Sequence, residues 1–97
     1  MERLTVSVII PTYNRAHLIR RALDSVLSQT EPGDEIIVVD DGSCDNTEQA
    51  LKAYGDRIRY FKTENAGAGA ARNRGVKEAR GALVGFMDWP NGQIAQE

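Results

Sequence analysis

The sequence has 97 residues, of which 41% are hydrophobic and 27% are charged, so it provides at most one domain with one modest core. Its 12 basic and 14 acidic residues leave a formal charge of -2, which argues against the basic face that nucleic-acid binding requires. Apolar runs such as Val8-Ile9-Ile10 are far too short to span a membrane, and the first five residues lack the apolar stretch of a secretory signal. The single cysteine, Cys44, cannot form an internal disulfide. We therefore expect a soluble, cytoplasmic α/β protein.

The first half of the chain predicts two buried strands with a helix between them. Residues 5–10 and 35–39 are rich in β-branched side chains and almost continuously apolar, as are strands buried on both faces of a parallel sheet. Between them, apolar residues three and four positions apart predict a helix with a broad apolar face. These residues are Leu18, Ile19, Ala22, Leu23, Val26 and Leu27. Asn14 is expected to cap the start of this helix.

The second half continues the same alternation of helix and strand. Asp45 with Glu48 resembles a capping box and predicts a helix that stops at Gly55. Residues 57–62 alternate between polar and apolar side chains, which is typical of a strand near a sheet edge. The remaining elements are a glycine-rich turn over 65–69, a third helix over 70–80 and a fourth strand over 82–87.

Strict alternation of strands and helices favours a parallel sheet. Right-handed crossovers and the edge character of the third strand then predict the strand order 3-2-1-4. We therefore expect a Rossmann-like, three-layer α/β/α fold whose sheet has four parallel strands. In such a sheet every loop that follows a strand emerges at the edge formed by the carboxyl ends of the strands, where ligands of open α/β sheets bind.

The polar clusters of the sequence all fall on this one edge. They occupy residues 11–15, 40–43 and 65–74 and position 88. Together they supply an aromatic ring, carboxylates, arginines beside a glycine-rich loop and several amides. A nucleotide needs a ring to stack on its base, acceptors for its base and ribose, and cations for its phosphates. The clusters therefore favour a nucleotide site.

Each of these clusters also has a purely structural explanation. Residues 40–43 fit ordinary turn chemistry, although two adjacent carboxylates repel each other and are better explained by a ligand or an ion. Tyr13 fits a half-buried packing residue, and Arg72 fits the exposed face of a helix. Gly67 fits a tight turn that approaches no phosphate, and Asp88 fits a structural strand end.

Three other phosphate-binding patterns fit the sequence poorly. It contains no G-x-x-x-x-G-K-[ST], which excludes a P-loop. A dinucleotide fold places G-x-G-x-x-G after the first strand, but residues 11–16 contain no glycine. Phospho-acceptor receiver domains place paired carboxylates after the first strand, whereas Asp40 and Asp41 follow the second.

Four motifs in order give a more specific signal. They are Ser7-Val-Ile-Ile-Pro-Thr-Tyr-Asn-Arg15, Ser25-Val-Leu-Ser-Gln-Thr30, Val39-Asp-Asp-Gly-Ser43 and Asn65-x-Gly-x-x-x-Ala-Arg-Asn-x-Gly75. Over nearly the whole chain the sequence thereby resembles the inverting family 2 glycosyltransferases. The resemblance implies a GT-A fold, a nucleotide-diphospho-sugar donor with a UDP-sugar as first candidate, and transfer of the sugar with inversion.

By that resemblance the nucleotide-sugar site comprises Pro11, Thr12, Tyr13, Asp40, Asp41, Asn65, Gly67, Arg72 and Asp88. Tyr13 is expected beside the base, while Asp41 accepts a hydrogen bond from the base ring and Asp40 flanks it. Arg72 is expected at the base or at the phosphates. Asp88 matches the first carboxylate of the D-x-D motif, which contacts the ribose and helps to hold Mn²⁺ or Mg²⁺. Such a cation stabilises the leaving nucleoside diphosphate.

The sequence departs from the family directly after Asp88. Pro90 stands where the second D-x-D carboxylate belongs, and proline cannot bind a metal. The acceptor site and the catalytic base of family members lie in a later region that has no counterpart here. We therefore expect residues 1–88 to form the nucleotide-sugar-binding half of the domain, residues 89–97 to be an unmatched tail, and the chain to be inactive alone. The alternative is a non-catalytic homologue whose exposed sheet edge pairs with a second copy or another partner.

Overall fold

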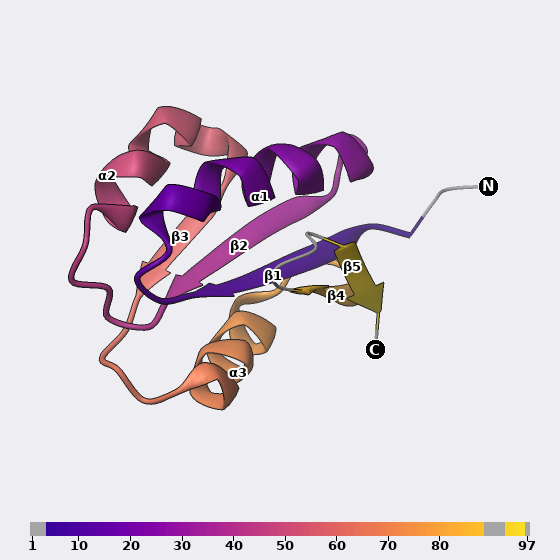
Figure 1. The fold of residues 1–97 in the computed structure, drawn as a ribbon. Helices are drawn as coiled ribbons and strands as arrows, with labels where there is room; N and C mark the ends of the chain where they lie inside the picture. Colours follow the sequence, from indigo (N-terminus) through magenta and orange to yellow (C-terminus); the bar gives the residue numbers. More distant parts are fainter. Residues whose placement is uncertain (1–3, 89–92, 97) are drawn as a thin grey trace.

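The computed structural model describes residues 4–88 and 93–96 of the chain. Figure 1 shows a twisted sheet with helices on both of its faces. The elements are β1 (Val6–Thr12), α1 (Ala16–Gln29), β2 (Glu35–Asp40), α2 (Thr47–Leu51), the 3-10 helix η1 (Lys52–Arg57), β3 (Arg59–Lys62), α3 (Ala68–Glu78), β4 (Leu83–Asp88) and β5 (Gln93–Gln96). Within the described ranges, no helix is long and apolar enough to cross a membrane.

The sheet has the order β3-β2-β1-β4-β5. β1 pairs in parallel with both β2 and β4, and β2 pairs in parallel with β3, so the predicted parallel order 3-2-1-4 and the Rossmann-like fold class are confirmed. β5 was not predicted and pairs antiparallel with β4. The expectation that the sheet stops at its fourth strand was therefore wrong, because the outer edge of β4 is already paired within the chain.

Two apolar layers hold the helices to the sheet. On one face, α1 and α2 pack on alternate residues of β1 and β2, which point the same way because side chains alternate along a strand. This core contains Val8, Ile10, Ile19, Leu23, Val26, Ile36, Val38, Leu51 and Tyr54. On the other face, Ala71 of α3 packs with Ile37 and Val39. The central strands are thus buried on both faces, as their continuous apolar runs indicate.

The start of α1 differs from the prediction. The helix begins at Ala16, after Arg15 as its N-cap residue, and no side chain of that cap accepts a hydrogen bond. Asn14 was therefore wrongly expected to cap it. The backbone N–H of Ala16 instead donates to Asp45 Oδ2 at 3.1 Å. A residue from the loop after β2 thus satisfies one of the orphan donors at the start of α1.

The start of α2 differs in a similar way. Its N-cap residue is Asn46, again with no side-chain cap hydrogen bond, so the capping box of Asp45 and Glu48 was wrong. Asp45 Oδ1 accepts the backbone N–H of Thr47 at 3.0 Å. One aspartate therefore serves the first turns of two helices.

α3 lies unusually close to β1, because Gly75 faces Ile9. A Cβ atom on Gly75 would overlap the Cγ2 methyl of Ile9 and would lie 2.9 Å from its Cγ1. The helix begins at Ala68, two positions before the predicted start at residue 70. The close approach of this helix fixes its amino-terminal end against the carboxyl ends of the central strands.

We expect Gly75→Ala to destabilise the fold by about 1–3 kcal/mol, because the added methyl group has no space against Ile9. Gly69→Ala, in the same helix, is the matched control: a Cβ there meets nothing within 4 Å, so the higher helix propensity of alanine should stabilise by up to about 1 kcal/mol. Urea unfolding of both variants measures the difference. Equal stabilities would contradict the close helix–strand contact.

Candidate functional site

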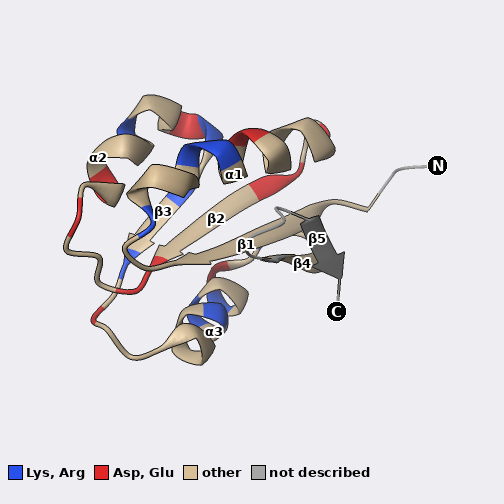
Figure 2. Cartoon of the chain, in the orientation of Figure 1, with Lys and Arg blue, Asp and Glu red and all other residues tan. Residues whose placement is uncertain are grey.

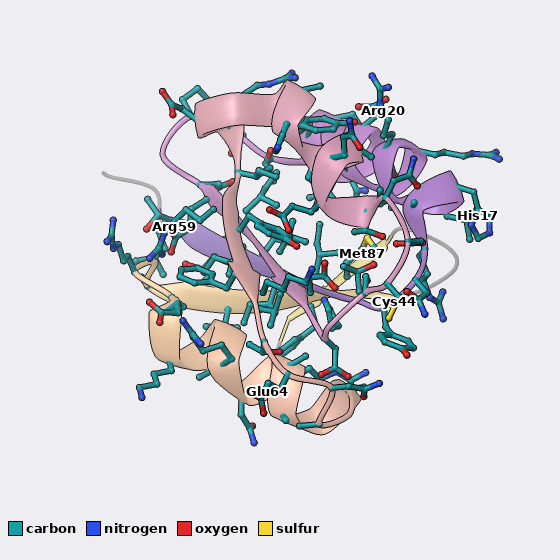
Figure 3. The ribbon with its side chains drawn as sticks, turned by 90° about the vertical axis from the view of Figure 1, so that its left-hand side faces the viewer. His17, Arg20, Cys44, Arg59, Glu64 and Met87 are labelled. Atoms are coloured by element: carbon teal, nitrogen blue, oxygen red, sulfur yellow. The ribbon has the colours of Figure 1, made fainter. Side chains whose placement is uncertain are left out.

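A pocket of about 470 Å³ opens at the edge where the parallel strands end. Figure 3 views the molecule from the side of this edge. Residues from the loops after β1 and β2, the turn before α3, the start of α3 and the end of β4 line it: Pro11, Thr12, Tyr13, Arg15, Asp41, Asn65, Gly67, Ala68, Ala71, Arg72 and Met87. Segments far apart in the sequence therefore form one continuous wall.

The pocket brings most of the predicted site residues together. Pro11, Thr12, Tyr13, Asp41, Asn65, Gly67 and Arg72 all line it. Asp40 is not among the lining residues and lies behind the wall. Asp88 ends β4, where its backbone is opposite Gln93, and its side chain is outside the described part of the structure, as is Pro90.

Four lining residues were not assigned from the sequence: Arg15, Ala68, Ala71 and Met87. Arg15 lies within the predicted loop cluster, two positions after Tyr13, so its position alone could have indicated it. Ala68 and Ala71 are spaced i, i+3 at the start of α3, which puts them on the same helix face. Met87 directly precedes Asp88 at the end of a strand.

The loop after β1 is held by the loop after β2. Thr12 is opposite Asp40 in the parallel register, and its carbonyl accepts the N–H of Asp41 at 2.9 Å. Two residues after Thr12, the loops exchange two further hydrogen bonds at Asn14. The N–H of Asn14 donates to Ser43 Oγ, and Asn14 Oδ1 accepts the N–H of Cys44, both at 2.8 Å. These contacts fix the chain on either side of Tyr13.

Asp41 connects the loop after β2 to the glycine-rich turn. Its Oδ1 accepts the N–H of Ala66 at 2.9 Å, and its Oδ2 accepts the N–H of Gly67 at 3.0 Å. Gly67 has φ of 99°, a conformation that favours glycine. Each carboxylate oxygen has a further lone pair, so Asp41 can hold the turn and still accept a hydrogen bond from a ligand.

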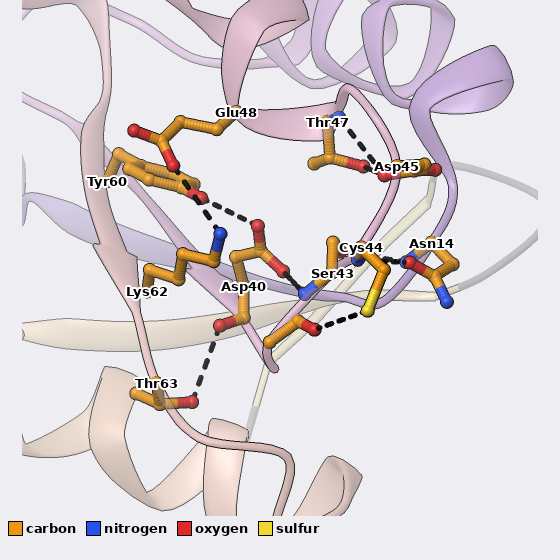
Figure 4. Close-up of polar contacts among 11 residues, drawn as sticks. Asn14, Asp40, Ser43, Cys44, Asp45, Thr47, Glu48, Tyr60, Lys62 and Thr63 are labelled. Carbon is orange, nitrogen blue, oxygen red and sulfur yellow. Dashed lines mark hydrogen bonds and ion pairs between the residues drawn. The ribbon is translucent and has the colours of Figure 1, made fainter.

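Asp40 points to a different set of partners. The carboxylate is fully buried, at 0% exposure. Its Oδ1 accepts the N–H of Ser43 at 2.9 Å, and its Oδ2 accepts the hydroxyl of Tyr60 at 2.6 Å, as Figure 4 shows. Burial and the adjacent Asp40 carboxylate raise the pKa of Tyr60 above its ordinary value, so the hydroxyl keeps its proton and donates at neutral pH.

Thr12 carries an unsatisfied polar group at the pocket. The residue is 3% exposed, and among the described residues its Oγ1 is the one buried side-chain oxygen or nitrogen without a hydrogen-bond partner. Buried polar atoms in native proteins almost always have a partner. This hydroxyl therefore distinguishes the pocket from the well-satisfied core around it.

The charges around the pocket favour an anionic ligand with a polar ring. The carboxylate of Asp41 and the guanidinium groups of Arg15 and Arg72 all line it. Figure 2 shows acidic residues at the carboxyl end of β2 and basic residues on α1 and α3. The exposed ring of Tyr13, at 41% exposure, provides a flat apolar surface beside these charges.

The described residues do not assemble a divalent metal site. No group of three or more His, Cys, Asp or Glu side chains lies together in residues 4–88 and 93–96 in a way that could hold an ion. A metal-binding role of Asp88 stays a prediction from the D-x-D resemblance.

The parallel sheet, with a pocket at the carboxyl ends of its strands, defines a Rossmann-like α/β protein, and sequence comparison gives its family. A family model described as Glycosyl transferase family 2 matches residues 7–89. The chain belongs to this family, which confirms the resemblance seen in its motifs. An "Uncharacterized glycosyltransferase" of Rickettsia felis is 54% identical over 84 residues, covering 84% of this chain and 14% of that protein. "Glycosyltransferase GlyA" of Streptococcus pneumoniae is 42% identical over 86 residues, covering 86% of this chain and 12% of that protein.

Solved structures show the same fold. The mannosyltransferase PcManGT from Pyrobaculum calidifontis, in complex with GDP-Man and Mn²⁺, matches with a TM-score of 0.81 and 34% identity over 92% of this chain and 29% of that chain. TarS 1-349 of S. aureus, in complex with UDP-GlcNAc, matches with a TM-score of 0.79 and 36% identity over 88% of this chain and 26% of that chain. The chain thus spans under a third of the length of these relatives.

We expect Asp41→Asn to loosen the turn before α3. The new amide NH₂ would face a backbone N–H, so one of the two hydrogen bonds to Ala66 and Gly67 would be lost, at a cost of about 1–3 kcal/mol. Chemical unfolding measures this loss, and hydrogen exchange at the two amides locates it. Asp56→Asn, at an exposed position of η1, changes the net charge equally and should leave both amides protected. Similar exchange in the two variants would contradict the role of Asp41.

Proposed function

We propose that the pocket binds the nucleoside diphosphate part of a nucleotide-diphospho-sugar donor, whose sugar is transferred to an acceptor by inversion. The observation that carries this proposal is the convergence of an exposed aromatic ring, a carboxylate and two guanidinium groups on one pocket at the carboxyl edge of the sheet. Ligands of open α/β sheets bind at this edge. Structures of similar chains in complex with GDP-Man and UDP-GlcNAc support the same class of ligand.

Each group has a matching role toward such a ligand. The ring of Tyr13 stacks on the base, since an aromatic face accepts any base. Asp41 accepts the ring N–H of the base with the lone pairs that its two backbone contacts leave free. Arg15 and Arg72 supply positive charge and planar donors, which suit phosphate oxygens. Uridine diphosphate is the first candidate, because one ring N–H facing a carboxylate is the donor that uracil offers.

The proposed role of the described residues is donor binding. Neither the acceptor site nor a catalytic base is assigned among them, so the expectation that this chain does not transfer sugar by itself stays part of the proposal. Because Pro90 occupies the place of the second D-x-D carboxylate, we also propose that nucleotide binding here depends little on a divalent cation.

Thermal unfolding with millimolar uridine diphosphate, or guanosine diphosphate in a parallel series, tests the proposal. A ligand at 100 times its Kd adds roughly 2.7 kcal/mol of stability, which raises the melting temperature of a domain of this size by several degrees. We expect one of the two nucleotides to give such a shift, with no further increase from Mn²⁺. A larger shift with Mn²⁺ would contradict the metal-independent part, and no shift with either nucleotide would contradict donor binding.

Substitution at Tyr13 tests the stacking role. We expect Tyr13→Ala to weaken nucleotide binding by roughly tenfold or more, because stacking on an aromatic side chain contributes about 1–3 kcal/mol per base. Tyr13→Phe keeps the ring and should bind like the wild type. Calorimetric titration of the three proteins measures the affinities. Equal affinities for the alanine and phenylalanine variants would place the base elsewhere.

A further inference from the structure

One residue between two pocket-lining residues has an unfavourable backbone conformation. Asn14 has φ of 50° and is the single non-glycine residue with positive φ in the described parts of the chain. This conformation costs free energy for every residue other than glycine, although less for asparagine than for most. It persists only where contacts with the rest of the structure stabilise it. Asn14 separates Tyr13 from Arg15, and both neighbours line the pocket. The conformation of Asn14 therefore sets the directions in which the ring and the guanidinium group leave the chain.

Two hydrogen bonds from the loop after β2 hold Asn14 in this conformation. Its N–H donates to Ser43 Oγ, and its Oδ1 accepts from the N–H of Cys44. Figure 4 shows Asn14, Ser43 and Cys44 lying together at the end of the sheet. Ser43 is itself buried, so its hydroxyl has little freedom to find another partner. The placement of Ser43 thus decides whether Asn14 stays in place.

Ser43 is in turn placed by the buried carboxylate of Asp40, which accepts the Ser43 N–H at 2.9 Å. The other oxygen of this carboxylate accepts the hydroxyl of Tyr60 at 2.6 Å. Tyr60 belongs to β3, the edge strand, and does not line the pocket. A continuous chain of hydrogen bonds therefore runs from the edge of the sheet to the pocket wall.

We propose that Tyr60 is a positioning residue for nucleotide binding: its hydroxyl orients Asp40 and thereby orders the pocket wall at Tyr13. The connection passes through the Ser43 amide and the Asn14 hydrogen bonds. This inference rests on the proposed function, because the wall is ordered for a nucleotide. It assigns a role in binding to a residue outside the pocket and explains why Asp40, beside the pocket-lining Asp41, faces away from the ligand.

The physical reason lies in the burial of Asp40. A carboxylate without solvent needs a hydrogen-bond donor for each oxygen. If the Tyr60 hydroxyl is removed, Oδ2 lacks its donor, and the carboxylate lowers its energy by turning toward another donor or toward water. Either movement lengthens the hydrogen bond from the Ser43 N–H, and the contact that holds Asn14 weakens with it.

Tyr60→Phe tests this series of hydrogen bonds, and Tyr54→Phe is its control. Tyr54 also donates its hydroxyl to an aspartate, Asp24 Oδ1, at 2.9 Å, but it lies on η1 against α1. Its hydroxyl bonds to Asp24 and to the carbonyl of Arg20, and both residues belong to α1 rather than to the pocket loops. Both variants lose the same chemical group and one charge-assisted hydrogen bond. Asp24 is exposed whereas Asp40 is buried, so Tyr60→Phe should lose more stability than Tyr54→Phe. Both variants are therefore compared while fully folded, where only a loss of pocket order changes the affinity for a nucleotide.

The affinities of the 97-residue chain and both variants for uridine and guanosine diphosphate are measured below their melting temperatures, with hydrogen exchange at the amides of Asn14, Ser43 and Cys44. We expect Tyr60→Phe to bind roughly fivefold more weakly and to exchange these amides faster. Tyr54→Phe should match the wild type in both readouts. Ser43→Ala, which removes the acceptor of the Asn14 N–H, should repeat the loss of affinity and serves if Tyr60→Phe does not fold.

The outcomes separate this inference from the proposed function. If the wild type binds a nucleotide but Tyr60→Phe and Tyr54→Phe bind equally well, the positioning role is overturned while donor binding stands. If the wild type binds neither nucleotide, donor binding is overturned. Hydrogen exchange at the amides of Asn14, Ser43 and Cys44 then still tests whether Tyr60 orders the loops beside the pocket. Faster exchange in Tyr60→Phe alone supports this ordering role, and unchanged exchange overturns it as well.

Discussion

The structure of the site depends on the parallel register of β1 and β2. In this register Thr12 is opposite Asp40, so the two strands end side by side and their loops begin at the same level. The Asp41 N–H can then bond to the Thr12 carbonyl, and the Asn14 contacts follow within two residues. A register shift of one residue would reverse the face of every side chain in the strand and would separate both loops. The apolar layers on both faces of these strands make such a shift very unfavourable.

The same register gives the adjacent carboxylates separate tasks. From the sequence, the adjacent carboxylates of Asp40 and Asp41 were better explained by a ligand or an ion than by a turn alone, because like charges repel. The protein instead supplies donors to both: Tyr60 and the Ser43 amide for Asp40, and the amides before α3 for Asp41. Asp40 is the last residue of β2, and Asp41 is the first residue after it. Because side chains alternate between the two faces along an extended chain, the sequence could have suggested that the two carboxylates have different partners. The carboxylate of Asp40 therefore holds the loop after β2, and the carboxylate of Asp41 faces the pocket.

Most of the fold could be predicted because the signals are local. The apolar runs of β1 and β2 and the edge pattern of β3 directly indicate the order 3-2-1-4, and the carboxyl-edge rule indicates which loops meet. β5 was missed because its sequence, Gln93-Ile-Ala-Gln96, has too few apolar residues to predict a strand, and it forms by pairing with β4. The predicted caps of α1 and α2 were wrong for a related reason. Asp45 bonds to Ala16, 29 residues away, and no local pattern reports a contact between two loops.

The residues of the pocket were predictable as a group, whereas their orientations were not. Tyr13, Asp41, Gly67 and Arg72 could be located from motifs at strand and helix ends. The partner of Asp40 could not, because its Oδ2 accepts a hydrogen bond from Tyr60, twenty residues further along the chain. The central claim is that these elements form one nucleotide site. The most direct measurement is an NMR titration of the backbone amides with uridine diphosphate and, separately, guanosine diphosphate. The account predicts saturable shifts grouped at residues 12–15, 41–44 and 65–72. Shifts elsewhere on the sheet, or none at saturating concentrations of either nucleotide, would contradict it.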